Sequence, residues 1–386
     1  MRVAIVADDL TSAADAAGPF VKAGLSGRIL LDPFAAMSTD ADVVAIDTNS
    51  RDCLEAAAAT VTSQVMKAVC DATLVIKTVD STLRGHLAAE VGAALAASGR
   101  QTALVAPAFP AEGRCTRGAV QYVHGVPALH SYFGAVGVHP ARTSNLHELF
   151  PEAHAWTSDA ALPTGVVIAD ASTDIDLDTV VASVGDPSRV LWVGSPGLAA
   201  ALARAYDRRC RRDCPVVPRA GRTLVAVGSR NELSLRQLGE LVPAEQIVAL
   251  PTGDVGASIP VLASVLRDSG LGGLVDVSVG NTATEVGHRL AATAAAVFAD
   301  GLFDAVFMTG GATARALLQA MKVDSLDLLD EPEPGVVLAT TSLPKPLLVL
   351  VKAGGFGTPQ TFQRLHQLFT REKDEECHEA DRYHHG

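Results

Sequence analysis

Short apolar runs of valine, isoleucine, leucine and alanine alternate with longer alanine-rich segments along almost the whole chain. The short runs carry few polar residues, which is typical of strands that are covered on both faces in a parallel sheet. They predict strands at residues 3–7, 28–31, 43–47, 74–78, 103–106, 165–169, 190–193, 223–227, 247–250, 274–277, 305–308 and 347–351.

The longer segments have the spacing of amphipathic helices. In residues 52–69 the apolar side chains recur every three or four positions, which places on one helix face Leu54, Ala58, Val61, Val65 and Ala68. Another helical pattern begins near Leu87. Strands that alternate with such helices predict an α/β fold, with mainly parallel sheets flanked by helices.

Residues 208–221 interrupt this alternation. This stretch is rich in arginine, contains Pro215 and Pro218, and shows no apolar period, as is common between domains. We therefore predict two α/β domains with the active site in the cleft between them. The predicted units are an N-terminal domain at 1–207, a linker at 208–221, a C-terminal domain at 222–370 and a disordered, mostly charged tail at 371–386.

Composition narrows the classes of function. The chain has 386 residues, of which 48% are apolar and 19% charged, so it is not disordered as a whole. Aromatic residues make up 4% and the net charge is −12, which opposes binding to nucleic acid. No apolar run reaches the ~18 residues of a membrane span. The N-terminus lacks a signal-peptide pattern and the six cysteines are scattered, so we expect a cytoplasmic protein with reduced thiols. The sequence leaves open whether the protein forms a homo-oligomer.

Polar side chains cluster directly after the predicted strands of the N-terminal half. Asp8 and Asp9 follow the first strand, where Thr11 or Ser12 could cap the next helix. Paired acids there either favour the helix end or bind a metal ion or a substrate hydroxyl. Arg51, after the third strand, is either a carboxylate-binding group or a solvated surface residue, and nearby hydroxyls could cap the helix that follows.

The densest cluster is the run KTVDSTLRG at residues 77–85, between a strand and a helix. Ligands of parallel sheets bind at the carboxyl ends of strands, and helix N-termini favour anions. The run therefore indicates a polar, negatively charged small molecule, with Asp80 accepting a hydroxyl proton and Arg84 binding a carboxylate. The alternative is a charged loop in which Ser81 or Thr82 caps the helix.

Further candidates lie in loops that contain glycine. The loop at 106–116 carries Arg114 and Thr116, and is either part of the site or a structural turn. In the C-terminal half, glycine-rich turns follow three strands, at 228–229, 308–314 and 352–357. Glycine lets backbone N–H groups approach phosphates closely, although at such turns it is often only structural. Three such turns in one domain predict a nucleotide phosphate site.

These motifs, in this order, resemble the four-carbon acid sugar kinase family. The matches are ADDLT at 7–11, KxxDSTLRG at 77–85, PAFPxxGR at 107–114, TGGxTA at 309–314 and KxGGFG at 352–357. They extend over residues 3 to about 369, which is most of the chain. The resemblance implies an ATP-dependent kinase of threonate, erythronate or oxo-tetronates, with an N-terminal domain for the acid and a C-terminal domain for the nucleotide.

The motifs and the resemblance together define two sets of expected contacts. The sugar acid would be bound by Asp9, Arg51, Lys77, Asp80, Ser81, Thr82, Arg84 and Arg114. Asp80, Asp9 and Arg84 would be catalytic, with either aspartate as the base. ATP, with Mg²⁺, would be bound by Ser229, Gly310, Gly311, Ala312, Thr313, Lys352, Gly354 and Gly355. No metal ligand is identified.

Two positions depart from the family pattern. Ser12 stands where the family usually has glycine, and Ala312 stands where it usually has aspartate. A carboxylate missing from the nucleotide turn motivates an alternative, namely a non-catalytic or altered sugar-acid-binding homologue with a weakened nucleotide site. A dehydrogenase is a third hypothesis from the α/β pattern and the glycine turns, although the dinucleotide fingerprint is missing.

Overall fold

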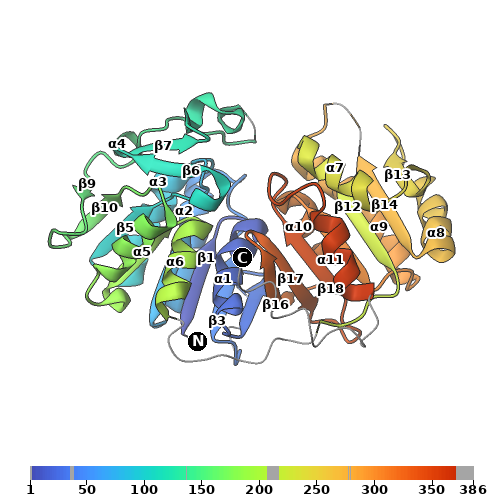
Figure 1. Ribbon diagram of the computed structural model, residues 1–386, viewed down its shortest axis with the longest axis horizontal. Helices are drawn as coiled ribbons and strands as arrows, with labels where there is room; N and C mark the ends of the chain where they lie inside the picture. Colours follow the sequence, from blue (N-terminus) through green and yellow to red (C-terminus); the bar gives the residue numbers. More distant parts are fainter. Residues whose placement is uncertain are drawn as a thin grey trace.

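The computed structural model describes residues 2–34, 39–135, 137–206, 217–276, 278 and 280–370. Within them the chain forms two lobes of alternating strands and helices that lie side by side, the N-terminal lobe in blue to green and the C-terminal lobe in yellow to red (Figure 1). The predicted tail and most of the predicted linker lie outside the described residues, so both stay predictions, as do the domain boundaries.

The N-terminal lobe is built on a parallel sheet in the order β2-β3-β1-β4-β11-β5-β10-β9. Its strands are β1 (Val3–Ala7), β2 (Gly27–Leu30), β3 (Val43–Asp47), β4 (Leu74–Thr78), β5 (Thr102–Ala106), β9 (His154–Trp156), β10 (Gly165–Ala169) and β11 (Val190–Gly194). One face is covered by α1 (Leu10–Lys22), α5 (Asp174–Ala182) and α6 (Pro196–Tyr206). The other is covered by α2 (Glu55–Val69), α3 (Leu87–Ser98) and α4 (Leu146–Leu149).

The C-terminal lobe has the same plan. Its parallel strands are β12 (Thr223–Val227), β13 (Ile247–Leu250), β14 (Leu271–Asp276), β15 (Ala305–Thr309) and β18 (Leu348–Lys352). On one face lie α8 (Ser258–Ser269), α9 (Ala283–Ala299) and α10 (Gly311–Ala320). On the other lie α7 (Glu232–Leu241) and α11 (Thr361–Thr370). The predicted α/β fold with mainly parallel strands and flanking helices is thus confirmed.

Strand β1 shows why the apolar runs were continuous. Val3, Ile5 and Ala7 belong to the core beneath α1, while Ala4 and Val6 belong to the core beneath α2 and α3. Successive side chains of a strand point to opposite faces, so a strand covered on both faces needs an apolar residue at every position.

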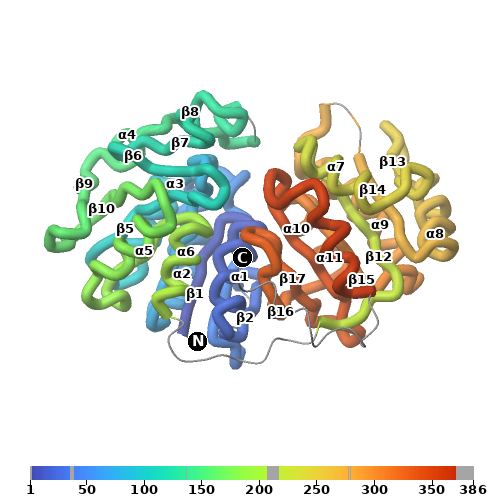
Figure 2. The backbone as a smooth tube through the Cα atoms, viewed as in Figure 1, coloured from blue at the N-terminus to red at the C-terminus, as the bar shows by residue number. Residues whose placement is uncertain are grey.

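The two lobes share one sheet, which the sequence did not predict. An antiparallel hairpin of β16 (Ser325–Glu333) and β17 (Val336–Thr341) extends the C-terminal sheet beyond β18, and β16 pairs antiparallel with β2. The described residues therefore form a continuous sheet of 15 strands. At the junction β2, β16 and β17 lie beside α1 (Figure 2).

An ion pair also joins the lobes. Arg315 of α10 donates to Asp47 at the end of β3, and a second nitrogen of the same guanidinium donates to the carbonyl of Leu31 at 2.9 Å. Burial raises the pKa of Asp47 to about 6 although Arg315 opposes the shift. The C-terminal lobe is thus fastened directly to the strand end that precedes Arg51.

Several local predictions were wrong. The buried face of α2 consists of Ala58, Thr62, Val65, Met66 and Val69, whereas Leu54 is 79% exposed because the helix begins after it. β14 starts three residues before the predicted strand. The beginning of β14 contains Gly272 and Gly273, and a Cβ atom on either glycine would crowd neighbouring leucine side chains of α7 or α8.

The expected helix caps were also wrong. Asp9, not Thr11 or Ser12, caps α1, because its carboxylate accepts from the backbone N–H of Ser12 at 2.7 Å. No side chain caps α2 or α3, so the hydroxyl groups after β3 and β4 serve other purposes. The loop at 106–116 is only partly irregular, since it leads into a small antiparallel sheet of β6 (Arg114–Arg117), β7 (Val120–Val123) and β8 (Val126–Pro127).

The junction contains a buried acid that should make stability depend on pH. Glu331 of β16 is 6% exposed beneath Gly18 of α1, and burial raises its pKa to about 7, opposed by the N–H of Gly335. The folded state then holds a proton that the unfolded state releases between about pH 4.5 and pH 7, so stability falls as pH rises through this window. We expect Glu331→Gln to remove up to about 3 kcal/mol of that fall. Urea unfolding across this window measures the pH dependence of the unfolding free energy, with Glu148→Gln at an exposed position of α4 as the control. Parallel pH profiles for wild type and Glu331→Gln would contradict the prediction.

Candidate functional site

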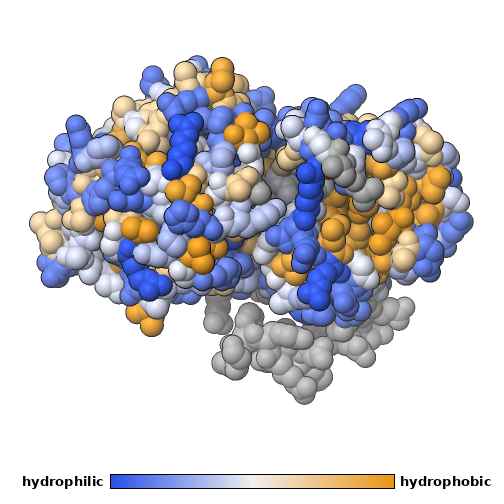
Figure 3. Space-filling view, turned by 90° about the horizontal axis from the view of Figure 1, so that it is seen from above, coloured by the Kyte–Doolittle hydropathy of each residue, from blue (hydrophilic) through white to orange (hydrophobic). Residues whose placement is uncertain are grey.

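Loops from both lobes surround one cavity of about 660 Å³. On the N-terminal side its walls come from the segments that follow β1, β3, β4 and β5, and on the C-terminal side from the segments that follow β12, β14, β15 and β18. Seen from above, the molecule is hollowed between the two lobes (Figure 3). The carboxyl ends of the parallel strands therefore face a shared space, as ligand sites of this fold class do.

Asp9 and Arg51 form the floor of the N-terminal side. Arg51 donates through Nε and Nη2 to the two oxygens of Asp8 at 2.7 and 2.8 Å, through Nη1 to Asp9, and through Nη2 to Ser12 at 2.7 Å. Burial would raise the pKa of Asp8, but the charges of Arg51 and Lys77 and the hydrogen bonds from Arg51 together outweigh it, and the pKa is lowered. Most N–H groups of Arg51 are thus occupied by protein acceptors, and Ser12 supplies a contact that a glycine could not.

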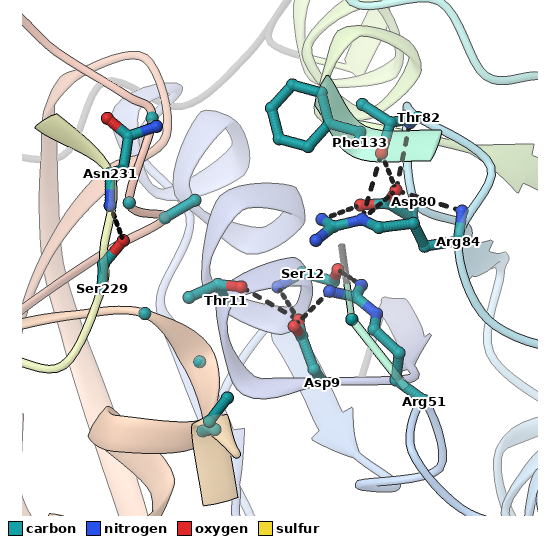
Figure 4. A pocket seen from close by; sticks show the side chains of 18 of the residues that line it. Asp9, Thr11, Ser12, Arg51, Asp80, Thr82, Arg84, Phe133, Ser229 and Asn231 are labelled. Carbon is teal, nitrogen blue, oxygen red and sulfur yellow. Dashed lines mark hydrogen bonds and ion pairs between the residues drawn. The ribbon is translucent and has the colours of Figure 1, made fainter. Parts of the chain in front are cut away.

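Asp80 organises the loop that follows β4. Its Oδ2 accepts from the backbone N–H groups of Thr82 and Arg84 at 3.1 and 3.2 Å and from the Thr82 hydroxyl, while Arg84 binds both of its oxygens (Figure 4). Burial alone would raise the pKa of Asp80, but Arg84, Arg51 and these hydrogen bonds hold it far below its usual range. Asp80 is therefore a firmly ionised carboxylate and a weak proton acceptor.

Two arginines share one aromatic ring, in an arrangement that we call the arginine cage (Arg84, Arg114 and Phe133). The guanidinium carbons of Arg84 and Arg114 each lie 5.4 Å from the ring centre of Phe133. Arg114 donates to the Ser81 hydroxyl at 3.1 Å, but its Nε has no partner among the described residues, and neither does Nη1 of Arg84. The free donors of the site are thus concentrated in this cage.

Both lysines of the predicted site are buried away from the cavity. Lys77 is fully buried, pairs with Glu90 at 2.8 Å and donates to the carbonyl of Thr78, so it cannot reach a substrate in the cavity as predicted. Lys352 is also fully buried and lies 3.4 Å from both the Thr309 hydroxyl and the Gly354 carbonyl. Burial lowers the pKa of Lys352 to about 7. Lys352 does not line the cavity, so its direct contact with the nucleotide stays a prediction, and the side chain lies behind the glycine turn.

The C-terminal wall consists of turns at the N-termini of three helices. Asn231, Thr282 and Gly310 are the N-cap residues of α7, α9 and α10, and all line the cavity. Backbone N–H groups at helix N-termini favour phosphate. Of the predicted nucleotide contacts, the ones that line this wall are Ser229, Gly310, Gly311, Ala312, Thr313, Gly354 and Gly355. Figure 4 places Ser229 and Asn231 across the open space from Arg84.

Asp9 is the link between the two walls. A Cβ atom on Gly311 would lie 2.9 Å from Oδ2 of Asp9 and 3.3 Å from the hydroxyl of Thr11, so the N-terminus of α10 approaches the N-terminus of α1 closely. Only glycine fits this approach without a shift. Asp9 therefore stands between the arginine cage and the glycine turns.

Several cavity residues were not foreseen, namely Asp15, Phe133, Asn231, Asn281 and Thr282. Thr282 and Glu285 form a capping box, which is a readable signal for a helix that starts at the ligand edge. Phe133 lies on a long excursion between β8 and α4, and nothing in its surrounding sequence marks it as part of the site.

The glycine turn after β18 predicts a specific effect on nucleotide affinity. A Cβ atom on Gly354 would overlap the hydroxyl of Ser229, which in turn accepts from the N–H of Asn231 at 3.2 Å. We expect Gly354→Ala to raise KM for ATP by ~10-fold or more by displacing Ser229, with KM for the acid little changed. Gly239→Ala on α7, where a Cβ meets nothing within 4 Å, is the matched control. Equal KM values for ATP in both variants would contradict this account.

Comparison with known proteins agrees with this division of the site. A model of a sugar-binding N-terminal domain matches residues 3–202, and a model of a nucleotide-binding C-terminal domain matches residues 273–362. A D-threonate kinase of Cupriavidus necator is 33% identical, over 96% of this chain and 98% of the relative. The chain belongs to the four-carbon acid sugar kinase family. The predicted family is confirmed, and with it the prediction of a phosphoryl-transferring enzyme.

Other members of the four-carbon acid sugar kinase family differ in their named substrate. A 3-oxo-tetronate kinase of Methylobacterium radiotolerans is 28% identical, over 94% of this chain and 98% of the relative.

A Bordetella bronchiseptica structure, described as a domain-swapped dimer with bound citrate, is 29% identical, covers 96% of this chain and 98% of its own, and has a TM-score of 0.50. A Salmonella typhimurium structure described as a putative tRNA synthase shares the fold, with a TM-score of 0.81 at 20% identity and coverage of 95% and 99%.

Two features are absent from the described residues, a ready-made metal site and a membrane-spanning helix. No group of three or more histidine, cysteine, aspartate or glutamate residues in this part of the chain is arranged to hold a metal ion. No helix there is both long and apolar enough to cross a membrane. Cys53, Cys70 and Cys115, the cysteines that the structure describes, form no disulfide with one another.

Proposed function

We propose that this protein uses ATP to phosphorylate a hydroxyl group of a four-carbon sugar acid such as threonate, erythronate or 3-oxo-tetronate. One observation carries the proposal: a cationic cage with free donors and a wall of helix N-termini face each other across one cavity, with Asp9 between them. The first suits a carboxylate and the second suits phosphates. The names of the relatives from Cupriavidus necator and Methylobacterium radiotolerans support the substrate class.

The arginine cage would bind the substrate carboxylate. Arg114 has the more available guanidinium, since the Ser81 hydroxyl is its one acceptor among the described residues, and Arg84 adds its free Nη1. Phe133 holds both planes in place and reduces their contact with water, which strengthens a charge-assisted bond. Arg51, predicted to share this role, would instead hold Asp8 and Asp9 in position.

Asp9 is our choice for the group that accepts the hydroxyl proton. It lies beside Gly311 of the phosphate-favouring wall, whereas Asp80 is tied to Arg84 and strongly acidic. A general base must reach the proton and have a matching proton affinity, and Asp80 fails the second requirement. Asp80 would then act by positioning Arg84. Phosphoryl transfer depends mainly on such positioning and on neutralising charge.

The nucleotide side needs few charged side chains. The turns at Ser229, Gly310–Thr313 and Gly354–Gly355 would hold the phosphates through backbone N–H groups. Mg²⁺ usually binds nucleotide phosphates and few protein groups, so it would enter the site together with ATP. ATP bound there would supply the phosphoryl group, and Ala312 leaves the turn without a carboxylate.

Purified protein incubated with ATP, Mg²⁺ and a panel of four-carbon acids tests the proposal through release of ADP. We expect release that depends on one or a few of these acids. No acid-dependent release from any of them would overturn it. Calorimetry then separates the alternatives: acid binding without nucleotide binding would favour the non-catalytic homologue suggested by Ala312. A nicotinamide absorbance change would favour the dehydrogenase.

Two further predictions concern the protein in the cell. A cytoplasmic location remains an expectation from the sequence alone. A homo-oligomer is supported by the dimer described for the Bordetella bronchiseptica protein, and the molar mass in solution would test it.

A further inference from the structure

Two residues that line the cavity each carry a buried polar atom without a hydrogen-bond partner. Among the described residues, eight buried side-chain nitrogen or oxygen atoms have no hydrogen-bond partner. Of the residues that carry them, Asp15, through Oδ1, and Arg114, through Nε, line the cavity. Buried polar atoms are nearly always satisfied, so two unsatisfied ones on residues that line the same cavity indicate partners supplied by a ligand.

Asp15 is held on a rigid element. It lies in the first half of α1, one turn after Thr11, and is 3% exposed. Gly18, one turn further along, packs against Glu331 of the junction, so the helix is fixed at this depth of the cavity. In the part of the chain that the structure describes, Asp15 forms no ion pair. Its carboxyl group nevertheless interacts at longer range with the charges of Arg114 and Lys352.

The environment of Asp15 favours its neutral form. Burial, then the charges of Asp9 and Glu331, raise its pKa well above the usual range. A neutral carboxyl group donates one hydrogen bond and accepts others, as a hydroxyl group does. It is a poor partner for a cation and a good one for an alcohol. Asp15 therefore suits a sugar hydroxyl better than a metal ion.

We propose that Asp15 is a specificity-determining residue that hydrogen-bonds one hydroxyl of the sugar acid while Arg114 binds its carboxylate. The proposal rests on the proposed function above. Both groups can be satisfied only when the hydroxyl lies at the right distance and direction from the carboxylate. The site would therefore select among four-carbon acids by the position and configuration of that hydroxyl. A site that leaves a buried polar group unpaired rejects a substrate that lacks the matching hydroxyl.

The test compares the full acid with analogues that each lack one hydroxyl, in the wild-type protein and in Asp15→Ala. We expect one analogue to lose ~10²-fold or more in kcat/KM with the wild type. Asp15→Ala should raise KM for the full acid by ~10-fold or more, and should handle that analogue and the full acid almost equally. Asp178→Ala, at a half-buried position of α5 outside the cavity lining, should keep the wild-type discrimination.

Asp15→Asn separates recognition from proton transfer. Asparagine keeps one donor and one acceptor, so a recognition role predicts near-normal kcat and only a several-fold change in KM. A ~10²-fold loss of kcat at unchanged KM would make Asp15 a base and overturn the proposal. So would full discrimination against every analogue in Asp15→Ala. If the wild type phosphorylates no four-carbon acid, the proposed function fails instead, and the two failures are distinct. Thermal unfolding checks that each variant is folded.

Discussion

Asp9→Asn is expected to lower kcat for the sugar acid by ~10²-fold to 10⁴-fold with little change in either KM. The carboxylate caps α1, accepts from Arg51 and Thr11, and lies against the N-terminus of α10 at Gly311. Asparagine preserves one oxygen for the cap but cannot take a proton from the attacking hydroxyl. Steady-state kinetics with ATP and the preferred acid measure both constants.

The matched control is Asp80→Asn. In the structure Asp80 holds Arg84 through both oxygens, so its loss should misplace the cage and raise KM for the acid, with kcat falling less than in Asp9→Asn. The reverse pattern, with near-normal kcat in Asp9→Asn and a collapse of kcat in Asp80→Asn, would identify Asp80 as the base despite its low pKa.

Arg114→Met should raise KM for the sugar acid by ~10²-fold to 10³-fold, while KM for ATP stays within a few-fold. Methionine fills the space against Phe133 and Phe356 but removes the free guanidinium donors. Arg114→Lys should recover only part of the loss, because a lysine makes neither paired bonds nor the flat stacking contact. Inhibition by simple dicarboxylates should weaken in parallel.

Arg117→Met provides the comparison for this substitution. Arg117 ends the same strand, β6, but is exposed and stacks on Tyr122 outside the cavity. It should leave both KM values unchanged. If Arg114→Met also leaves KM for the acid unchanged, the carboxylate binds elsewhere, and Arg51 is the next candidate.

The parts of the fold that follow from burial could be predicted from the sequence. Strands covered on both faces need unbroken apolar runs, and their carboxyl ends place Asp9, Asp80 and Arg84 at one edge of the sheet. The hairpin of β16 and β17 was not predicted, because along β16 buried positions alternate with partly buried ones, several of them acidic, and no continuous apolar run results.

Partner choice inside the site could not be predicted in the same way. Lys77 and Lys352 looked like anion-binding cations, yet one neutralises Glu90 and the other lies behind Gly354. Charge and position along the chain do not say which way a side chain turns when both faces of the sheet are buried. Phe133 and Asp15 could not be assigned to the site from the sequence, because only the folded chain brings their segments to Arg114 and the cavity.

The pairing of β2 with β16 limits how early the shared sheet can be completed during folding. Arg28 and Asp327, joined across this pair at 2.6 Å, are 299 positions apart. During synthesis β2 is therefore an open strand edge until the last part of the chain emerges, and contacts of such separation form late. An N-terminal half made alone would expose this edge. A hairpin from a second molecule would fit it equally well, so the same pairing offers a route to exchange of segments between copies.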